Sequence, residues 1–138
     1  VLNLVVRPVA ARQANEFETA FAGLERDRPD ALFVTTSGLN FSNRKLIMEL
    51  ALKSRLPALS ASREATEAGG LLSYSSNRVE RYRLAAIYVG KILKGSEPGN
   101  LPVEQATNYE LVINLKTAGM LNLEIPRSLL LIADEVIE

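Results

Sequence analysis

The sequence predicts an α/β domain in which helices flank an open parallel sheet. Short apolar runs alternate with amphipathic helical segments from the first residue up to Gly95. A length of 138 residues suits one domain, and a hydrophobic content of 47% supplies enough apolar mass for a core. We therefore expect residues 1–138 to form a single domain.

The first part of the chain contains three strand candidates and two helix candidates. Apolar runs predict strands at Val1–Val6, at Ala31–Thr35 and, very short, at Pro57–Leu59. Asn15 precedes apolar residues that recur at i, i+3, i+4 and i+7, which predicts a helix with Asn15 as its N-cap. Ser42 stands in the same position before the second helix.

The next segment continues the alternation. A helical turn is expected from Ser62 to Ala68, and two glycines end it. Leu71–Tyr74 follows as the fourth strand. Asn77 then caps the longest helix, which Gly95 closes.

The tail departs from this pattern. After a loop rich in glycine and proline, Tyr109–Leu115 predicts a strand and Lys116–Leu121 a short helix. A helical or extended piece follows Pro126. Nothing in the tail indicates an independent domain, so we expect it to wrap the sheet or to reach another part of a longer protein.

Composition excludes several function classes. The chain has neither cysteine nor histidine, which rules out disulfides, thiol chemistry, the usual zinc sites and a histidine general base. Its 16 basic side chains equal its 16 acidic ones, so net charge gives no reason to expect nucleic-acid binding. No glycine-rich phosphate loop follows a strand. We expect no enzyme activity, no metal and no cofactor.

Ligands of open parallel sheets bind beyond the carboxyl ends of the strands. That rule selects four loops: Arg7-Pro8, Thr35–Phe41, Ser60–Arg63 and Tyr74–Asn77. Their hydroxyls and amides can bind a small polar ligand, and their arginines can pair with a carboxylate. The same residue types also serve as helix caps, turn residues and surface ion pairs. The candidate ligand-binding residues are Arg7, Thr36, Ser37, Asn40, Phe41, Ser62, Arg63, Tyr74, Ser75 and Ser76.

Several stretches of the second half occur together in one known family. They are REATEAGGLLSY at 63–74, YVGKILKG at 88–95, LPVEQ at 101–105, ELVINLKTA at 110–118 and ADEVIE at 133–138. In this ordered set the chain resembles the extracytoplasmic solute-binding proteins of ABC importers that have a type I periplasmic-binding fold. The resemblance is close from about Pro57 onward and looser before it.

The resemblance implies a protein of two α/β lobes that close about a hinge around a small polar solute, an amino acid or an organic acid. Residues 1–138 would be most of the Rossmann-like C-terminal lobe, incomplete at its N-terminal end. Residues 107–138 would form a tail returning toward the hinge and the missing lobe. The full-length protein would be periplasmic, secreted or lipid-anchored, and would deliver its solute to a membrane permease.

Two departures from the family bear on the ligand. Many relatives carry an acidic residue in the loop matching Thr35–Phe41, where it can bind a ligand amine, but this loop has no carboxylate. Ser75 stands where relatives often have glycine. An organic acid therefore fits about as well as an amino acid.

A second function is compatible with the same fold. The chain would then be a ligand-sensing domain of a regulatory or signalling protein, in which closure acts on an attached output domain. An α/β enzyme is the third alternative, and the absence of histidine and cysteine argues against it.

A sheet that lacks its usual neighbouring strand exposes a pairing edge, so we expect this fragment to self-associate as a homo-oligomer. Size-exclusion chromatography with light scattering should give a mass well above 15.1 kDa at high concentration. A clean monomer would contradict this expectation.

Overall fold

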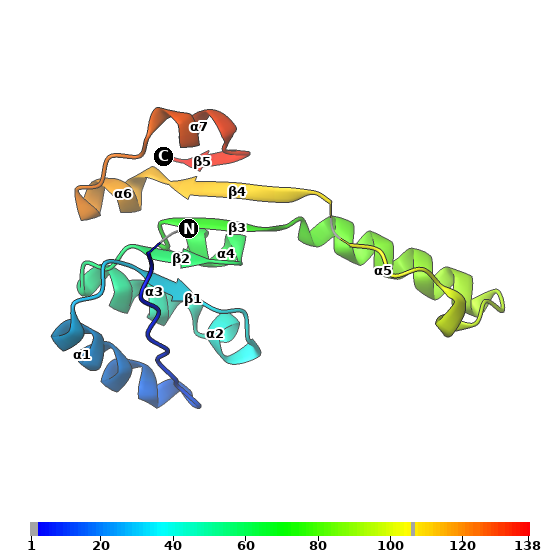
Figure 1. Ribbon diagram of the computed structural model, residues 1–138, viewed down its shortest axis with the longest axis horizontal. Helices are drawn as coiled ribbons and strands as arrows, with labels where there is room; N and C mark the ends of the chain where they lie inside the picture. The colour runs from blue at the N-terminus through cyan, green and yellow to red at the C-terminus, as the bar shows by residue number, and fades with distance from the viewer. Residues whose placement is uncertain (1–2, 106) are drawn as a thin grey trace.

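The computed structural model describes residues 3–105 and 107–138, and its centre is a five-stranded sheet in the order β1-β2-β3-β4-β5 (Figure 1). The strands are β1 (Leu32–Val34), β2 (Ala58–Ser60), β3 (Leu72–Ser76), β4 (Tyr109–Asn114) and β5 (Glu135–Ile137). The α/β class predicted from the sequence is confirmed. Four predicted strands lie within two residues of their expected positions.

The sheet is mostly parallel, as expected, and departs from that expectation at one pair of strands. β1 with β2, β2 with β3, and β4 with β5 are parallel pairs, but β4 runs antiparallel to β3. The register pairs Ser76, the last residue of β3, with Tyr109, the first of β4. The chain therefore leaves the sheet at the carboxyl end of β3 and re-enters it beside that end, which makes β4 antiparallel to β3.

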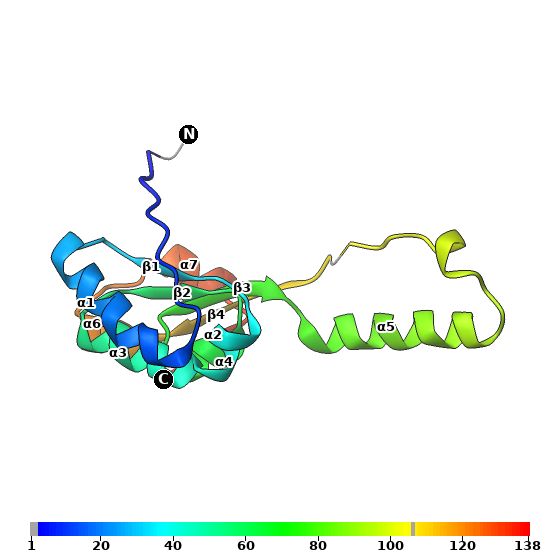
Figure 2. The same cartoon turned by 90° about the horizontal axis from the view of Figure 1, so that it is seen from below.

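Most helices cover one face of this sheet, as Figure 2 shows. On that face lie α1 (Phe17–Asp27), α3 (Arg44–Lys53), α4 (Arg63–Glu67) and α6 (Leu115–Leu121), and α7 (Arg127–Ile132) lies on the other. The short α2 (Gly38–Ser42) follows β1, and two 3₁₀ turns occupy Ala14–Glu16 and Pro98–Asn100. None of the helices in the described ranges is long and apolar enough to cross a membrane.

The core lies between the sheet and the helices that cover this face. Of the four periodic residues of α1 predicted from the sequence, Phe17, Phe21 and Leu24 are buried there and Ala20 is partly exposed. They pack with Ile47 and Met48 of α3. Each such side chain stabilises the fold by about 1.5–3 kcal/mol, because it leaves water.

The longest helix, α5 (Arg78–Leu93), does not cover the sheet. It projects from the end of β3, and residues 94–105 run back beside it (Figures 1 and 2). None of its residues is buried, and Val79, Ile87 and Leu93 are 58%, 53% and 82% exposed. Sequence periodicity identifies an apolar helix face but does not say what covers it, which is why α5 was expected on the sheet.

The expected strand at Val1–Val6 is wrong where the structure describes it. Residues 1–2 lie outside the described residues, and residues 3–6 form no strand. Leu4, Val5 and Val6 are 72%, 85% and 83% exposed. An apolar run becomes a strand only when a neighbouring strand satisfies its backbone groups, and this run has no such neighbour here.

One of the three N-caps expected from the sequence forms. Asn77 caps α5 as expected, its side chain accepting a hydrogen bond from the Glu80 N–H at 3.0 Å. Asn15 makes no such cap and lies inside the 3₁₀ turn before α1. Ser42 ends α2 instead of capping α3, because Ser37 starts that extra helix by accepting from the Asn40 N–H.

Asn114 joins the tail to the rest of the fold. Its side chain is buried, its Nδ2 donates to the Thr66 carbonyl of α4, and its Oδ1 accepts from the Thr117 N–H of α6, both at 3.0 Å. The Thr117 hydroxyl also donates to the Gly69 carbonyl at 3.0 Å. These contacts connect segments 48 residues apart.

Replacing Asn114 by alanine should lower the free energy of unfolding by about 1–3 kcal/mol, because it removes the cap of α6 and a buried hydrogen bond to the Thr66 carbonyl. Urea denaturation measures this change. Asn100→Ala, at an exposed hydrogen bond, is the matched control and should cost far less. Equal midpoints for the two variants would contradict the assigned role.

Candidate functional site

A hollow opens at the carboxyl ends of β1 and β2, beside the starts of α3 and α4. Val34, Met48 and Ala65 form its apolar wall. Its polar lining residues are Thr35, Thr36, Ser37, Asn40, Ser60 and Ser62. The hollow therefore lies at the sheet edge where the sequence places a ligand.

Several of the polar side chains also hold the loops in shape. Ser37 caps α2, and the Asn40 Nδ2 donates to the Thr35 carbonyl at 2.9 Å. The Ser60 hydroxyl oxygen accepts from the Ser62 N–H at 2.9 Å. The same residues therefore both shape the loops and line the hollow, where their remaining donors and acceptors can meet a ligand.

Phe41 lies in the lining with two arginines near its ring. The guanidinium carbon of Arg44 is 4.8 Å from the ring centroid, and that of Arg78 is 5.3 Å from it. Arg44 also donates from Nη1 to the Phe41 carbonyl at 3.0 Å. Cation–π attraction holds the guanidinium groups beside the ring, and the hydrogen bond ties the Arg44 side chain to the backbone of Phe41.

Sequence reasoning missed both arginines. Arg44 is the first residue of α3 and Arg78 the first of α5. Their shared signal is a cation at a helix start, where the macrodipole disfavours positive charge. For Arg78 that signal was readable from the sequence, since Asn77 was recognised as the cap of α5. For Arg44 it was obscured, because Ser42 had been placed as the cap of α3.

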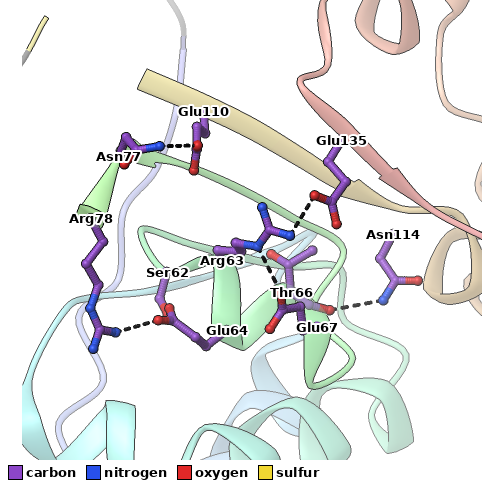
Figure 3. A network of polar contacts seen from close by, with 10 residues as sticks. All are labelled: Ser62, Arg63, Glu64, Thr66, Glu67, Asn77, Arg78, Glu110, Asn114 and Glu135. Atoms are coloured by element: carbon purple, nitrogen blue, oxygen red, sulfur yellow. Dashed lines mark hydrogen bonds and ion pairs between the residues drawn. The ribbon is translucent and has the colours of Figure 1, made fainter. Parts of the chain in front are cut away.

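Glu64 is the glutamate that contacts Arg78, as Figure 3 shows. It pairs with Arg78, and the Ser62 hydroxyl donates to its Oε2 at 2.8 Å. Burial raises the pKa of Glu64, but its own backbone N–H, the Ser62 hydroxyl and the charges of Arg78 and Arg44 outweigh burial and lower the pKa overall. Glu64 is therefore an anion that offsets one of the two arginine charges.

Arg63 is engaged in ion pairs outside the hollow (Figure 3). It donates to Glu67 at 2.8 Å and to Glu135 of β5 at 2.6 Å. The hydrogen bond to Glu67 raises the pKa of Arg63, and that to Glu135 adds to it against the effect of burial. These contacts fit the ion-pair alternative for Arg63, which ties α4 to the far strand.

Arg7 and the end of β3 are likewise not brought to the hollow. Arg7 lies 3.7 Å from Asp27, which ends α1 just before β1 begins, at the opposite edge of the sheet. Tyr74 stacks on Tyr109 with ring centroids 5.3 Å apart. Of the ten candidates, the structure gathers Thr36, Ser37, Asn40, Phe41 and Ser62 at the hollow, and leaves Arg7, Arg63, Tyr74, Ser75 and Ser76 outside its lining.

A family described as ABC transporter substrate binding protein matches residues 1–137. No curated protein is similar enough to the chain to count as a relative. Three solved structures are similar in fold. They are a conserved domain protein from Vibrio cholerae O1 biovar El Tor, an ABC domain in complex with L-Trp from Streptococcus pneumoniae, and a ligand-free, open substrate-binding protein with adhesive properties from Clostridium difficile.

The Vibrio protein is 25% identical, with a TM-score of 0.84 over 91% of this chain and 42% of that one. The Streptococcus protein is 26% identical, with a TM-score of 0.88 over 97% of this chain and 46% of that one. The Clostridium protein, at 21% identity and a TM-score of 0.64 over 90% and 41%, shows the fold alone. The chain spans less than half the length of each.

Replacing Glu64 by glutamine should cost less than about 1 kcal/mol at pH 7, since the side chain is 31% exposed and solvent screens the pair. The clearer effect of this substitution is on how the free energy of unfolding depends on pH. Because folding lowers the pKa of Glu64 below its ordinary value of 4.5, its contribution is full above that value and is lost as the pH falls further.

Urea denaturation across this acidic range should therefore give a shallower pH dependence for Glu64→Gln than for the unmodified protein. Glu18→Gln, at an exposed position of α1, removes the same charge away from the hollow and is the control. Identical slopes for Glu64→Gln and the unmodified protein would show that the network does not stabilise the anion.

Proposed function

Because the chain belongs to the family of ABC transporter substrate-binding proteins, we propose that it forms most of the C-terminal lobe of a two-lobe protein that captures a small polar solute. The observation that carries this proposal is the hollow at the carboxyl ends of β1 and β2. Its polar loops and the Phe41 ring are one wall of a solute site. The other wall belongs to the second lobe.

The chemistry of the hollow supports an amino acid or an organic acid as the solute. Hydroxyl and amide groups at Ser37 and Asn40 supply hydrogen bonds, and Phe41 supplies an apolar surface. The similar Streptococcus structure has L-Trp bound, which supports an amino acid. The loop Thr35–Phe41 has no carboxylate for a ligand amine, which supports an organic acid equally.

We place the hinge where the chain leaves and re-enters the sheet. The Asn77 N–H donates to the Asn108 carbonyl at 3.0 Å, and the Asn108 Nδ2 donates to Glu80 at 2.6 Å. Asn77 also contacts Glu110 of β4 (Figure 3). The two segments, one at Asn77 and one at Asn108, lie side by side and can bend together. The tail, residues 107–138, starts at the second segment.

The exposed helix α5 supports a second lobe. Its apolar side chains, with Val79 at one end and Leu93 at the other, are exposed along its whole length. Exposed apolar surface on this scale is typical of an interface. We infer that α5 packs on the other lobe, so that this helix travels with that lobe when the protein closes.

The mechanism is closure without chemistry. A solute that contacts both lobes binds the closed form more tightly than the open one, and so shifts the population toward it. The closed form would be what a membrane permease of the ABC transporter recognises. This role assigns the full-length protein to the extracytoplasmic side, secreted or lipid-anchored.

A thermal-shift screen of the two-lobe protein tests this function with amino acids, organic acids, sugars and nucleosides. One solute class should raise the melting temperature, since ligand at about 100 times its Kd adds about 2.7 kcal/mol. Phe41→Ala should abolish the shift. Phe33→Ala, which removes a 63% exposed ring from β1 outside the hollow, should keep it.

A folded two-lobe protein that responds to no solute in the screen would contradict solute capture. An equal loss of the shift in the Phe41→Ala and Phe33→Ala variants would contradict the location of the site.

A further inference from the structure

We propose that Arg44 is the anchor for a carboxylate of the bound solute, which makes the site selective for carboxylic acids over their neutral amides. This inference rests on the proposed function and names the substrate class of that site. It assigns a binding role to a residue that the sequence did not single out.

The first argument is the charge of the hollow. Among the described residues that line it, Arg44 carries the only formal charge, and the others are neutral polar or apolar groups. Arg44 is half-buried, so water screens its charge less than that of a surface arginine. A positive group in a neutral hollow favours an anionic ligand.

The second argument is that Arg44 and Arg78 share a single carboxylate, Glu64. Arg78 has Glu64 as its ion-pair partner, whereas Arg44 forms no ion pair within residues 3–105 and 107–138. Both arginines begin helices, where the macrodipole opposes a positive charge. The pair of arginines with one glutamate leaves one net positive charge beside the hollow.

The third argument is that the Arg44 guanidinium is held in place with donors to spare. One hydrogen bond, from Nη1 to the Phe41 carbonyl at 3.0 Å, and the Phe41 ring at 4.8 Å fix its position. A guanidinium has five N–H donors, so several are left for a carboxylate, which it can bind in a two-pronged geometry. Fixing the group beforehand reduces the entropy lost on binding.

The neighbouring groups complete a subsite for such a solute. The Phe41 ring offers an apolar surface next to the guanidinium, and Ser37 and Thr36 line the hollow close to it in sequence. A molecule with a carboxylate at one end and an apolar part beside it matches this arrangement.

A purely structural role for Arg44 makes a different prediction. If Arg44 only holds the Phe41 loop, its loss weakens every ligand by the same factor, whether the ligand is charged or not. If Arg44 binds the carboxylate, its loss weakens acids alone. Paired acids and amides of the same shape therefore separate the two roles.

The experiment uses isothermal titration of the two-lobe protein with three pairs: phenylacetate and phenylacetamide, L-leucine and L-leucinamide, and succinate and succinamide. In the unmodified protein at least one acid should bind ten-fold or more tighter than its amide. Arg44→Gln should weaken that acid about 30-fold or more and leave the amide unchanged within about two-fold. Arg44→Lys, which keeps the charge without the planar fork, should lose less.

Arg26→Gln is the matched control, because it removes an exposed arginine from α1 and should leave both members of a pair unchanged. If Arg44→Gln does not fold, the acid-to-amide ratios of the unmodified protein and of Arg44→Lys still test the proposal. Equal binding of acid and amide by the unmodified protein overturns it, as does an equal loss for both in the Arg44 variants.

The outcome also distinguishes this inference from the proposed function. Tight binding of a neutral sugar or nucleoside that Arg44→Gln leaves unaffected overturns the carboxylate anchor while solute capture stands. Failure of every solute to bind a folded two-lobe protein overturns both.

Discussion

The buried hydrogen bonds of Asn114 are the constraint on which the rest of the structure depends. A tail that enters the sheet antiparallel is held by its ladder to β3, and a buried link to a helix on the covered face holds it in addition to the exposed Arg63–Glu135 ion pair. Asn114 supplies that link by bonding Thr66 of α4 and the start of α6 together. Because Asn114 holds α4 at Thr66, it also helps to position Ser62 and Glu64 at the start of that helix. Ser62 is part of the lining of the hollow.

The sequence was sufficient where the signal is local. Asn77 was recognised as a cap because the cap contacts a backbone group three residues away. The buried face of α1 followed from apolar spacing alone. The strands β1 to β3 were found because each is a short apolar run between strong turn signals.

The sequence was insufficient where a structural feature depends on residues far away along the chain. The run at Val1–Val6 has strand composition, but a strand also needs a neighbour, which composition cannot supply. The direction of β4 depends on where α5 takes the chain before it comes back. Arg44 and Arg78 are 34 positions apart in sequence, and their convergence on Phe41 is a property of the fold. Arg7 was misplaced for the same reason, because its position followed from a strand that does not form.

The excursion of the chain through α5 also has a consequence for how the protein unfolds. Ser76 and Tyr109 are paired in the sheet, yet between them the described residues 77–105 and 107–108 contribute no strand to it. Closing such a loop costs entropy that grows only slowly with its length, so the insertion itself is tolerated. In the proposed two-lobe arrangement, however, the same loop ends are fixed by one lobe and its helix by the other. Unfolding of either lobe then releases a restraint on the other lobe. The two lobes therefore stabilise each other and should unfold as one cooperative unit.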